Sequence, residues 1–175
     1  MTAFSSGAPE ELRVIEDFCN TAILLHDIDE LRTVPDARDW LNRAGWDPIA
    51  SDRELSRLRD ERETIRTFLV DRSDPSARHS LNELGQRHWA GARVDDDGWL
   101  ALVPAAGSIS PAGSAVEALL LNGLTASGRR LKACASDTCR YVFYDASRPR
   151  TRVWCDMKVC GARSKMRDYR IRLDS

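Results

Sequence analysis

The sequence predicts a mainly α-helical protein with one small β-hairpin, followed by a module built around four cysteines. Apolar residues recur at helical spacing through much of residues 9–128, whereas residues 90–103 alternate in the manner of two strands joined by a turn. Cys134, Cys139, Cys155 and Cys160 form two C-x4-C pairs separated by fifteen residues. We therefore expect a helical N-terminal domain at residues 1–128 and a cysteine module at residues 129–175.

The first two helices are predicted from apolar periodicity. From about Pro9, one buried face is formed by Leu12, Ile15, Phe18, Cys19, Ala22 and Ile23. After a polar linker, residues 36–44 form a short helix with Trp40 and Leu41 facing inward, and Gly45 ends it.

A capping box, Ser51 with Glu54, starts the third helix, which is expected to run to about Val70. Its core stripe is Leu55, Leu58, Ile65, Phe68 and Leu69. Acids alternate with arginines on its other face, which we expect to be solvated rather than bound to nucleic acid. A fourth helix begins at Asp74-Pro75, contains Leu81 and Leu84, and ends near Gly85.

The hairpin and the last helix of the body follow. Strands at residues 90–94 and 99–103 flank a turn that ends at Gly98, and we expect this pair of strands to lean on the helices because two strands alone are marginally stable. Ser110-Pro111 then begins a helix that Gly128 ends, with a core face of Val116, Leu119, Leu120 and Leu124.

The paired cysteines predict a structural metal site. Four thiolates in two matched pairs can close a tetrahedron around Zn²⁺ and leave no position for water. Two disulfides, or four unrelated core cysteines, are the alternatives. No signal-peptide pattern opens the chain and no apolar run is long enough to span a bilayer, so we expect a cytoplasmic protein with reduced thiols and no membrane partner. The fifth cysteine, Cys19, is interpreted as a core thiol.

The order of elements around the cysteines predicts a treble-clef-like zinc finger. A strand at residues 141–144, a turn, a return strand at residues 152–154 and a helix from Gly161 to about Arg172 follow the first cysteine pair. A module of this size has too little core to fold by itself, so the metal must supply much of its stability.

Charge is divided unevenly along a chain whose net charge is only −1. Residues 129–175 hold 13 Lys and Arg against 5 Asp, whereas residues 1–128 hold 13 Arg against 22 acids. A folded basic module on an acidic body indicates a polyanionic partner, and nucleic acid is favoured over a merely solvated basic tail.

The candidate nucleic-acid-binding residues lie in the last helix and in the turn before it. Arg163, Arg167 and Arg170 fall at i, i+4 and i+7 on one helical face, where their like charges repel unless an anion lies across them. Arg guanidinium groups donate two parallel hydrogen bonds to phosphate, so we expect this set of basic side chains to contact the phosphate backbone of double-stranded DNA. The remaining members are Arg148, Arg150, Arg152 and Lys165.

The sequence also resembles known families. The segments Phe143-Tyr144-Asp145-x-Ser147-Arg148, Arg152-x-Trp154-Cys155-x-Met157 and Cys160-Gly161-Ala162-Arg163-x-Lys165 closely resemble the CGNR zinc-finger family. Asp17 to Thr21, Trp40-Leu41 and Leu81-Asn82 are similar to the ABATE domain that precedes this finger in bacterial stress-induced transcription regulators. The resemblance implies a structural Zn²⁺, DNA binding and control of transcription. Ala162 stands where the family has Asn, which removes any hydrogen bond made by that side chain.

Other interpretations remain. The body is expected to sense a small-molecule effector or to form a homodimer, and Asp17, Asn20 and Thr21 are candidates to line a ligand pocket, although they could equally be solvated or helix-terminal. A zinc-stabilised adaptor that binds RNA or an acidic protein would carry the same basic surface. An enzyme is disfavoured because a four-cysteine site leaves no open metal position and no catalytic constellation surrounds His26, His79 or His88.

Overall fold

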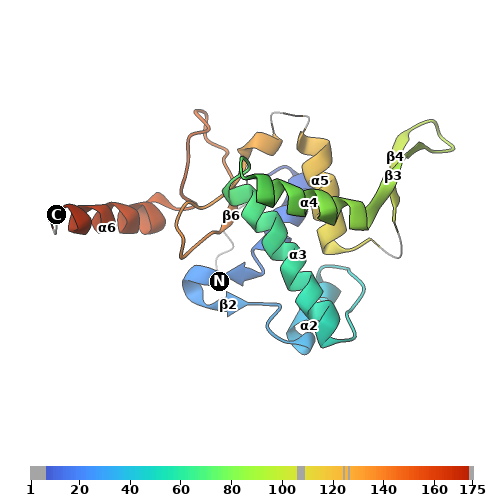
Figure 1. Cartoon of the computed structure of the whole chain (residues 1–175), viewed down its shortest axis with the longest axis horizontal. Coiled ribbons are helices and arrows are strands. Elements are labelled where there is room, and N and C mark those ends of the chain that lie inside the picture. The colour runs from blue at the N-terminus through green and yellow to red at the C-terminus, as the bar shows by residue number, and fades with distance from the viewer. Residues whose placement is uncertain (1–6, 106–108, 124, 126, 174–175) are drawn as a thin grey trace.

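Four helices form the core of the body. The computed structural model describes residues 7–105, 109–123, 125 and 127–173. Helix α1 (Glu10–Cys19) packs against α3 (Asp52–Val70) and α5 (Pro111–Gly123), and α4 (Pro75–His88) packs against α3 and α5 (Figure 1). The apolar face predicted for α1 is confirmed, because Leu12, Ile15, Phe18 and Cys19 are fully buried.

A short helix and a hairpin with strands of two residues each lie beside this core (Figure 1). Helix α2 (Val34–Arg43) begins two residues before the predicted start, because Thr33 and Asp36 form a capping box there. Trp40 and Leu41 are buried as predicted. Between α1 and α2, strands β1 (Ala22–Ile23) and β2 (Ile28–Asp29) flank a single 3₁₀ turn (Leu24–His26), so this linker is structured.

Helix α3 starts at the predicted capping box of Ser51 and Glu54 and ends at Val70. The expectation of a fully solvated charged face was wrong, since Glu61, Arg62 and Arg66 are buried. Arg62 can be buried because the segment between α1 and α2 supplies its partners: its Nη1 lies 2.7 Å from the Asp29 carboxylate and 3.0 Å from Thr21 Oγ1. A buried arginine is tolerated when it is paired in this way.

Arg66 ties α3 to the end of α1. Its guanidinium donates to the carbonyl of Cys19, the last residue of α1, and to the carbonyl of Ala22 in β1. The last carbonyls of a helix carry partial negative charge and lack partners in the helix. Burial lowers the pKa of Arg66, although the guanidinium stays charged. Arg62 and Arg66, which alternate with acids along the sequence, therefore connect α3 to other segments of the body, and periodicity cannot predict such contacts.

The hairpin projects from the body instead of leaning on the helices, contrary to our prediction. Helix α4 continues three residues past Gly85, and strands β3 (Trp89–Val94) and β4 (Leu100–Pro104) extend beyond it to one end of the molecule (Figure 1). The predicted turn is confirmed, with Gly98 at φ 85°. Only the base of the hairpin is fixed, where Trp89 Nε1 donates to the Gly113 carbonyl at 3.0 Å.

Helix α5 buries small side chains. Ala112, Ala115, Val116 and Ala118 face the core, because the close approach of α1 leaves little room. The predicted core position Leu120 is instead 53% exposed, so that part of the prediction was wrong. Leu124 lies outside the described residues, and the helix ends at Gly123 rather than at Gly128.

The cysteine module shares the core of the body. After a 3₁₀ turn (Gly128–Arg130), strand β5 (Leu131–Ala133) pairs antiparallel with β6 (Val142–Tyr144). Leu131 and Val142 belong to the same buried cluster as α1 and α3. The predicted return strand at residues 152–154 does not form, because β5 pairs with one edge of β6 and the side chains of Glu16 and Asn20 occupy the other. The division at residues 128 and 129 stays a prediction.

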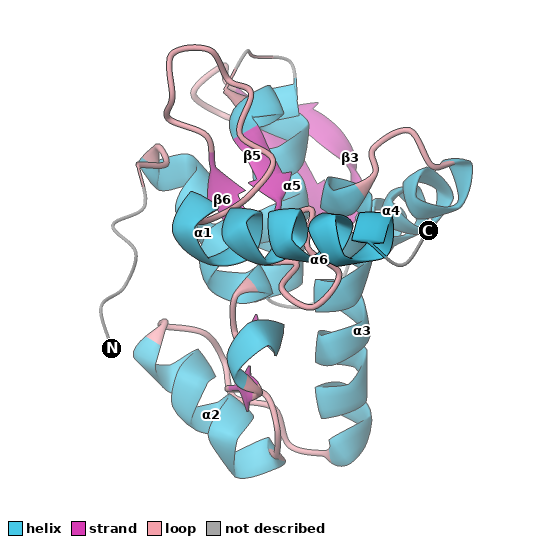
Figure 2. Cartoon of the chain, turned by 90° about the vertical axis from the view of Figure 1, so that its left-hand side faces the viewer, coloured by secondary structure: helices cyan, strands magenta, loops and turns pink. Residues whose placement is uncertain are grey.

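The final helix lies at the opposite end from the hairpin. A π-helical turn (Met157–Gly161) leads into α6 (Ala162–Leu173), close to the predicted helix, and α6 stands in front of the body when the molecule is viewed from that end (Figure 2). Together with the paired short strands, these helices confirm the predicted mainly α fold class with a cysteine-based finger. Of the helices that the structure describes, none combines the length and apolar character that crossing a bilayer requires.

Candidate metal centre and basic surface

The four predicted cysteines meet at one point. Their Sγ atoms all lie within 4.8 Å of one another, with Cys139 to Cys155 at 3.6 Å and Cys155 to Cys160 at 3.8 Å. A tetrahedron with Zn–S bonds of about 2.3 Å has edges of roughly 3.8 Å, whereas a disulfide requires about 2.05 Å. These cysteines are therefore unbridged and arranged as a metal-binding site.

Two tight turns place the cysteines. In the first, the Ser136 carbonyl accepts hydrogen bonds from the amides of Cys139 and Arg140, and Arg140 takes a left-handed conformation at φ 49°. In the second, the Asp156 side chain accepts from the amides of Lys158 and Val159, and its carbonyl accepts from Cys160. These hydrogen bonds close the two turns on which Cys139 and Cys160 lie.

The thiols influence one another strongly. Hydrogen bonds from Cys139 and Cys155 lower the pKa of Cys134. Cys155 donates to Cys134 and Cys139, which raises its pKa. Burial, then a hydrogen bond to Cys139 and the charges of the neighbouring sulfurs, raise the pKa of Cys160 to about 12. Four thiolates in contact need a cation between them, and a divalent metal supplies that charge.

Gly161 allows α6 to start directly beside the metal site. A Cβ atom at this position would collide with the Met157 sulfur and would lie 3.0 Å from Trp154 Cδ1. A larger residue after the last cysteine would therefore have to displace the exposed Met157 side chain and shift the indole ring slightly. Ala162, the residue that replaces the Asn of the CGNR motif, is exposed at the start of α6.

Sequence reasoning missed the ion pair between the buried Asp145 and the partly buried Lys132. The Asp145 carboxylate is fully buried and accepts from Lys132 Nζ at 2.7 Å, from the Ser147 hydroxyl at 2.5 Å and from the Arg152 amide at 3.0 Å. Burial opposes ionisation of Asp145, but these hydrogen bonds, that of Lys132 first, hold its pKa well below the ordinary value. The available signal was the Asp-x-Ser sequence, which is typical of an Asx turn.

This pair shapes the loop between residues 146 and 153. Lys132 Nζ also donates to the carbonyls of Arg150 and Arg152, at 2.7 and 2.9 Å, so one ammonium group holds both sides of the loop. Arg148 and Arg150 are exposed on it. Arg152 folds back, with its guanidinium 5.0 Å from the centre of the Phe143 ring and donating to the Cys155 carbonyl, so part of its bonding capacity is used inside the finger.

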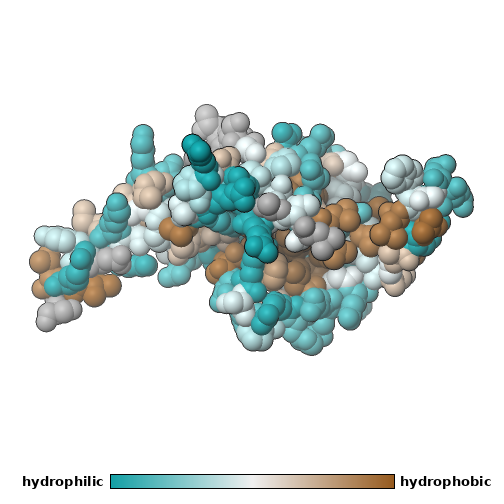
Figure 3. All heavy atoms as spheres, turned by 90° about the horizontal axis from the view of Figure 1, so that it is seen from above, coloured by the Kyte–Doolittle hydropathy of each residue, from teal (hydrophilic) through white to brown (hydrophobic). Residues whose placement is uncertain are grey.

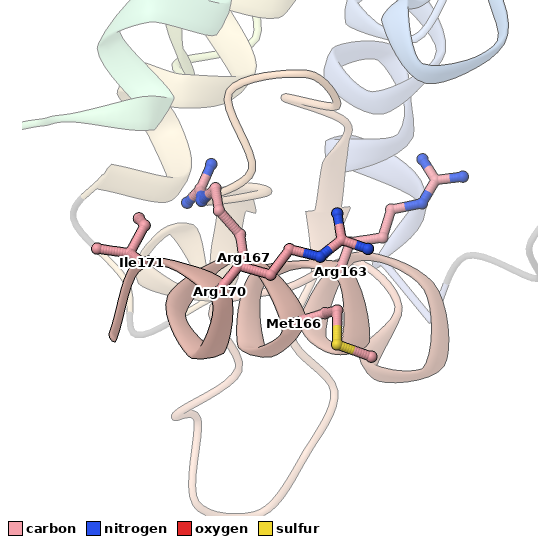
Figure 4. A pocket seen from close by; sticks show the side chains of 5 residues that line it. All are labelled: Arg163, Met166, Arg167, Arg170 and Ile171. Atoms are coloured by element: carbon pink, nitrogen blue, oxygen red, sulfur yellow. The ribbon is translucent and has the colours of Figure 1, made fainter. Parts of the chain in front are cut away.

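The predicted basic residues of α6 are all exposed. Arg163, Arg167 and Arg170 lie on the same side of the helix, where they line a shallow depression with Met166 and Ile171 (Figure 4). Arg167 also lies 3.8 Å from Asp137, a pair that is too exposed to hold the side chain firmly. Lys165 lies on another face of the same helix. The finger therefore carries basic residues both on α6 and on the loop of residues 146–153, here called the arginine loop.

The three candidate pocket residues have different surroundings. Asp17 is exposed. The Asn20 side chain donates to the Val142 carbonyl at 2.8 Å and accepts from the Val142 amide at 2.9 Å, and the Thr21 hydroxyl donates to the Phe18 carbonyl. Asn20 and Thr21 therefore serve the internal structure, and a ligand pocket at these residues stays a prediction.

Comparison with protein families agrees with this arrangement. Residues 130–173 match the CGNR zinc finger, which covers the metal site, the arginine loop and α6. Residues 12–137, well over half of the chain, match ABATE, described as "Putative stress-induced transcription regulator". The chain belongs to the ABATE family. No curated protein matches this ABATE chain. The resemblance noted in the sequence is thereby confirmed for both parts of the ABATE protein.

Proposed function

We propose that this ABATE protein is a transcription regulator that binds double-stranded DNA through its zinc finger. The observation that carries this proposal is the row of Arg163, Arg167 and Arg170 on a helix that projects from the metal site. The four cysteine ligands fit Zn²⁺ and fill its coordination sphere, which supports a structural metal rather than a catalytic one.

The exposure of α6 supports entry into a groove. A helix of 12 residues is about 18 Å long, and the major groove of B-DNA is wide enough to hold one. Arg163 and Arg170 are about 10 Å apart along the helix axis, so the row could follow one wall of phosphates. Arg148 and Arg150 extend from the loop beside it and add cationic groups.

The salt dependence of binding tests the role of this row. Binding to a random-sequence duplex would be followed by fluorescence anisotropy for the wild type and for the double variant Arg163→Ala/Arg167→Ala. Each lost phosphate contact lowers the log–log salt slope by roughly 0.9, so the double variant should lose about 1.8 and bind more weakly. Arg53→Ala, an exposed arginine near the start of α3, is the matched control and should change neither quantity.

Zinc content and far-UV circular dichroism of each variant separate lost contacts from lost folding. An unchanged salt slope in a zinc-loaded double variant would remove the phosphate-contact role from these two residues. Preference for single-stranded RNA over the duplex, or no binding to either, would favour the adaptor interpretation over a DNA-binding regulator.

A further inference from the structure

Two apolar surfaces at opposite ends of the molecule are left exposed by the residues that the structure describes. One lies on the β3–β4 hairpin and the other on α6, and the two elements stand at the two ends of the longest axis (Figure 1). Apolar residues gather at both of these ends in the space-filling view (Figure 3). Because of this separation, one copy of the chain cannot cover its own hairpin with its own α6.

The surface on α6 is a stripe along one side of the helix. Ala162, Met166, Tyr169 and Leu173 follow at i, i+4, i+7 and i+11, which places them on one face. Met166, Tyr169 and Leu173 are each more than half exposed. Arg163 and Arg170 border this stripe on one edge and Lys165 borders it on the other, so the stripe is framed by cations.

The surface on the hairpin is apolar with an acidic tip. Val94 and Leu100 are direct partners across the strands, and Ala92 and Leu102 form the next pair on the same face. Leu100 is 80% exposed, and Trp99 on the other face is 74% exposed. The turn between the strands carries Asp95, Asp96 and Asp97. An isolated two-stranded hairpin is marginally stable in water, so this one gains from a covering surface.

Charge decides which surfaces pair. Two hairpins in contact would bring two sets of three aspartates together, and two α6 helices would do the same with their arginines, so each like pairing is opposed by repulsion. A hairpin against α6 joins apolar area to apolar area and an acidic tip to a basic frame. The same chain supplies both, which makes a second copy the occupant that fits.

We propose that two copies pair antiparallel, so that the Ala162–Leu173 stripe of each α6 packs on the Val94–Leu100 face of the partner's hairpin. Because the two elements lie at opposite ends, a two-fold axis across the long axis forms both contacts at once and closes the assembly as a dimer. Arg163, Arg167 and Arg170 lie beside the stripe on a neighbouring side of α6. The dimer requires both the hairpin and the metal-folded finger, and it shares Arg163 and Arg170 with the proposed DNA-binding row, so it is measured without DNA.

Mixing two variants of the full, zinc-loaded chain tests this arrangement. The hairpin variant is Val94→Thr/Leu100→Thr, which keeps β-forming side chains, and the helix variant is Met166→Gln/Tyr169→Gln, which keeps helix-forming length. Mass would be measured by sedimentation equilibrium without DNA. For each variant alone, the dissociation constant of the dimer should rise roughly tenfold or more, because both contacts of its dimer lose apolar burial.

An equimolar mixture should recover dimer, since the intact α6 of the hairpin variant meets the intact hairpin of the helix variant and restores one of the two contacts. Leu24→Ser, at an exposed leucine outside both surfaces, should leave the wild-type dimer unchanged. A monomeric wild type overturns the proposal, and so do variants that dimerise like the wild type. Loss of dimer in only one of the two variants also overturns it, because that result indicates hairpin–hairpin or helix–helix contacts, and so does loss in both variants without recovery on mixing. Failure here leaves the salt-slope result for DNA intact, and the reverse holds.

Discussion

At the scale of single residues, a few buried charges determine how the finger presents its arginines. The Asp145 carboxylate satisfies the Ser147 hydroxyl and the Arg152 amide and neutralises Lys132, which in turn holds the carbonyls of Arg150 and Arg152. An arginine loop that was flexible would lose conformational entropy on binding a polyanion. The ion pair of Asp145 and Lys132 orders the loop before binding and so reduces that loss of entropy.

Replacing Asp145 with Ala should destabilise the finger. The change leaves the Lys132 ammonium and two backbone or side-chain donors without their acceptor, at a cost of about 2–4 kcal/mol. We expect faster release of zinc to a chelator and faster amide exchange of Arg152. Asp137→Ala, at an exposed aspartate of the first cysteine turn, is the control. Equal zinc-release rates for both variants would contradict the structural role of Asp145.

Glu61 should make the stability of the body depend on pH. Burial opposes ionisation of Glu61, but hydrogen bonds with His88 and Arg57 outweigh it and lower its pKa below the ordinary value. A lowered pKa contributes stability above the unfolded pKa of about 4.3, and this contribution is lost as the pH falls through the folded value.

Glu61→Gln should therefore be less stable than the wild type by about 1 kcal/mol near neutral pH, and the difference should vanish near pH 3. Urea unfolding followed by circular dichroism at several pH values measures the difference. Glu11→Gln, at an exposed glutamate of α1, should show no such trend. A difference that stays constant from about pH 6 to pH 3 would count against ionisation as its cause.

At the scale of elements, the finger is attached to the body by α1. Asn20, at the end of α1, pairs with both backbone groups of Val142, and the Glu16 carboxylate accepts from the Tyr144 amide at 2.7 Å. The side chains of Glu16 and Asn20 thus bond to backbone groups of β6 along one edge of this strand. Since β6 also pairs with β5, both of its edges are satisfied, and this fixes the finger on the helical core.

Asn20→Ala should loosen this attachment. Loss of the two hydrogen bonds to Val142 costs about 1–2 kcal/mol, so the Val142 amide should exchange with solvent at least several-fold faster. Asn82→Ala, at an exposed position of α4, is the matched control. Exchange at Val142 that does not change in the Asn20 variant would show that the strand pairing alone holds β6 in place.

At the scale of the whole molecule, the metal site and the core of the body are linked through β5 and β6. Leu131 and Val142 lie in the core cluster of the body, while Cys134 and Cys139 next to these strands hold the metal site. Loss of the metal should therefore affect more than the finger. The free energy of metal binding contributes to the folding of the entire chain.

Cys155→Ser should abolish zinc binding and lower the midpoint of thermal unfolding of the body as well. Amide protection should be lost throughout α6, while α3 and α4 keep theirs at low temperature. Metal analysis and hydrogen exchange measure both effects. Cys19→Ala, which removes a thiol from the body core, should keep the zinc. A Cys155 variant that retains zinc and a fully protected α6 would exclude this residue as a ligand.

Local patterns were sufficient wherever a residue's role depends on its near neighbours in sequence. The Ser51–Glu54 capping box, the Gly98 turn and the two C-x4-C pairs were predicted and are confirmed, because each forms within one or two turns of chain. The arginine row on α6 follows from helical periodicity alone. Apolar periodicity also located α1 and α2, whose buried faces are formed by residues three or four apart.

Spacing and periodicity, which are properties of the chain, were enough to predict the cluster of four cysteines, the approximate positions of the helices and the family. The three-dimensional structure was needed to show that Arg62 and Arg66 are buried, that Asn20 bonds to β6 and that the hairpin projects from the body. The physical reason is that a charged or polar side chain is buried when distant residues supply its partners, and an apolar strand is exposed when none covers it. Both depend on contacts between segments far apart in the sequence, which no local pattern contains.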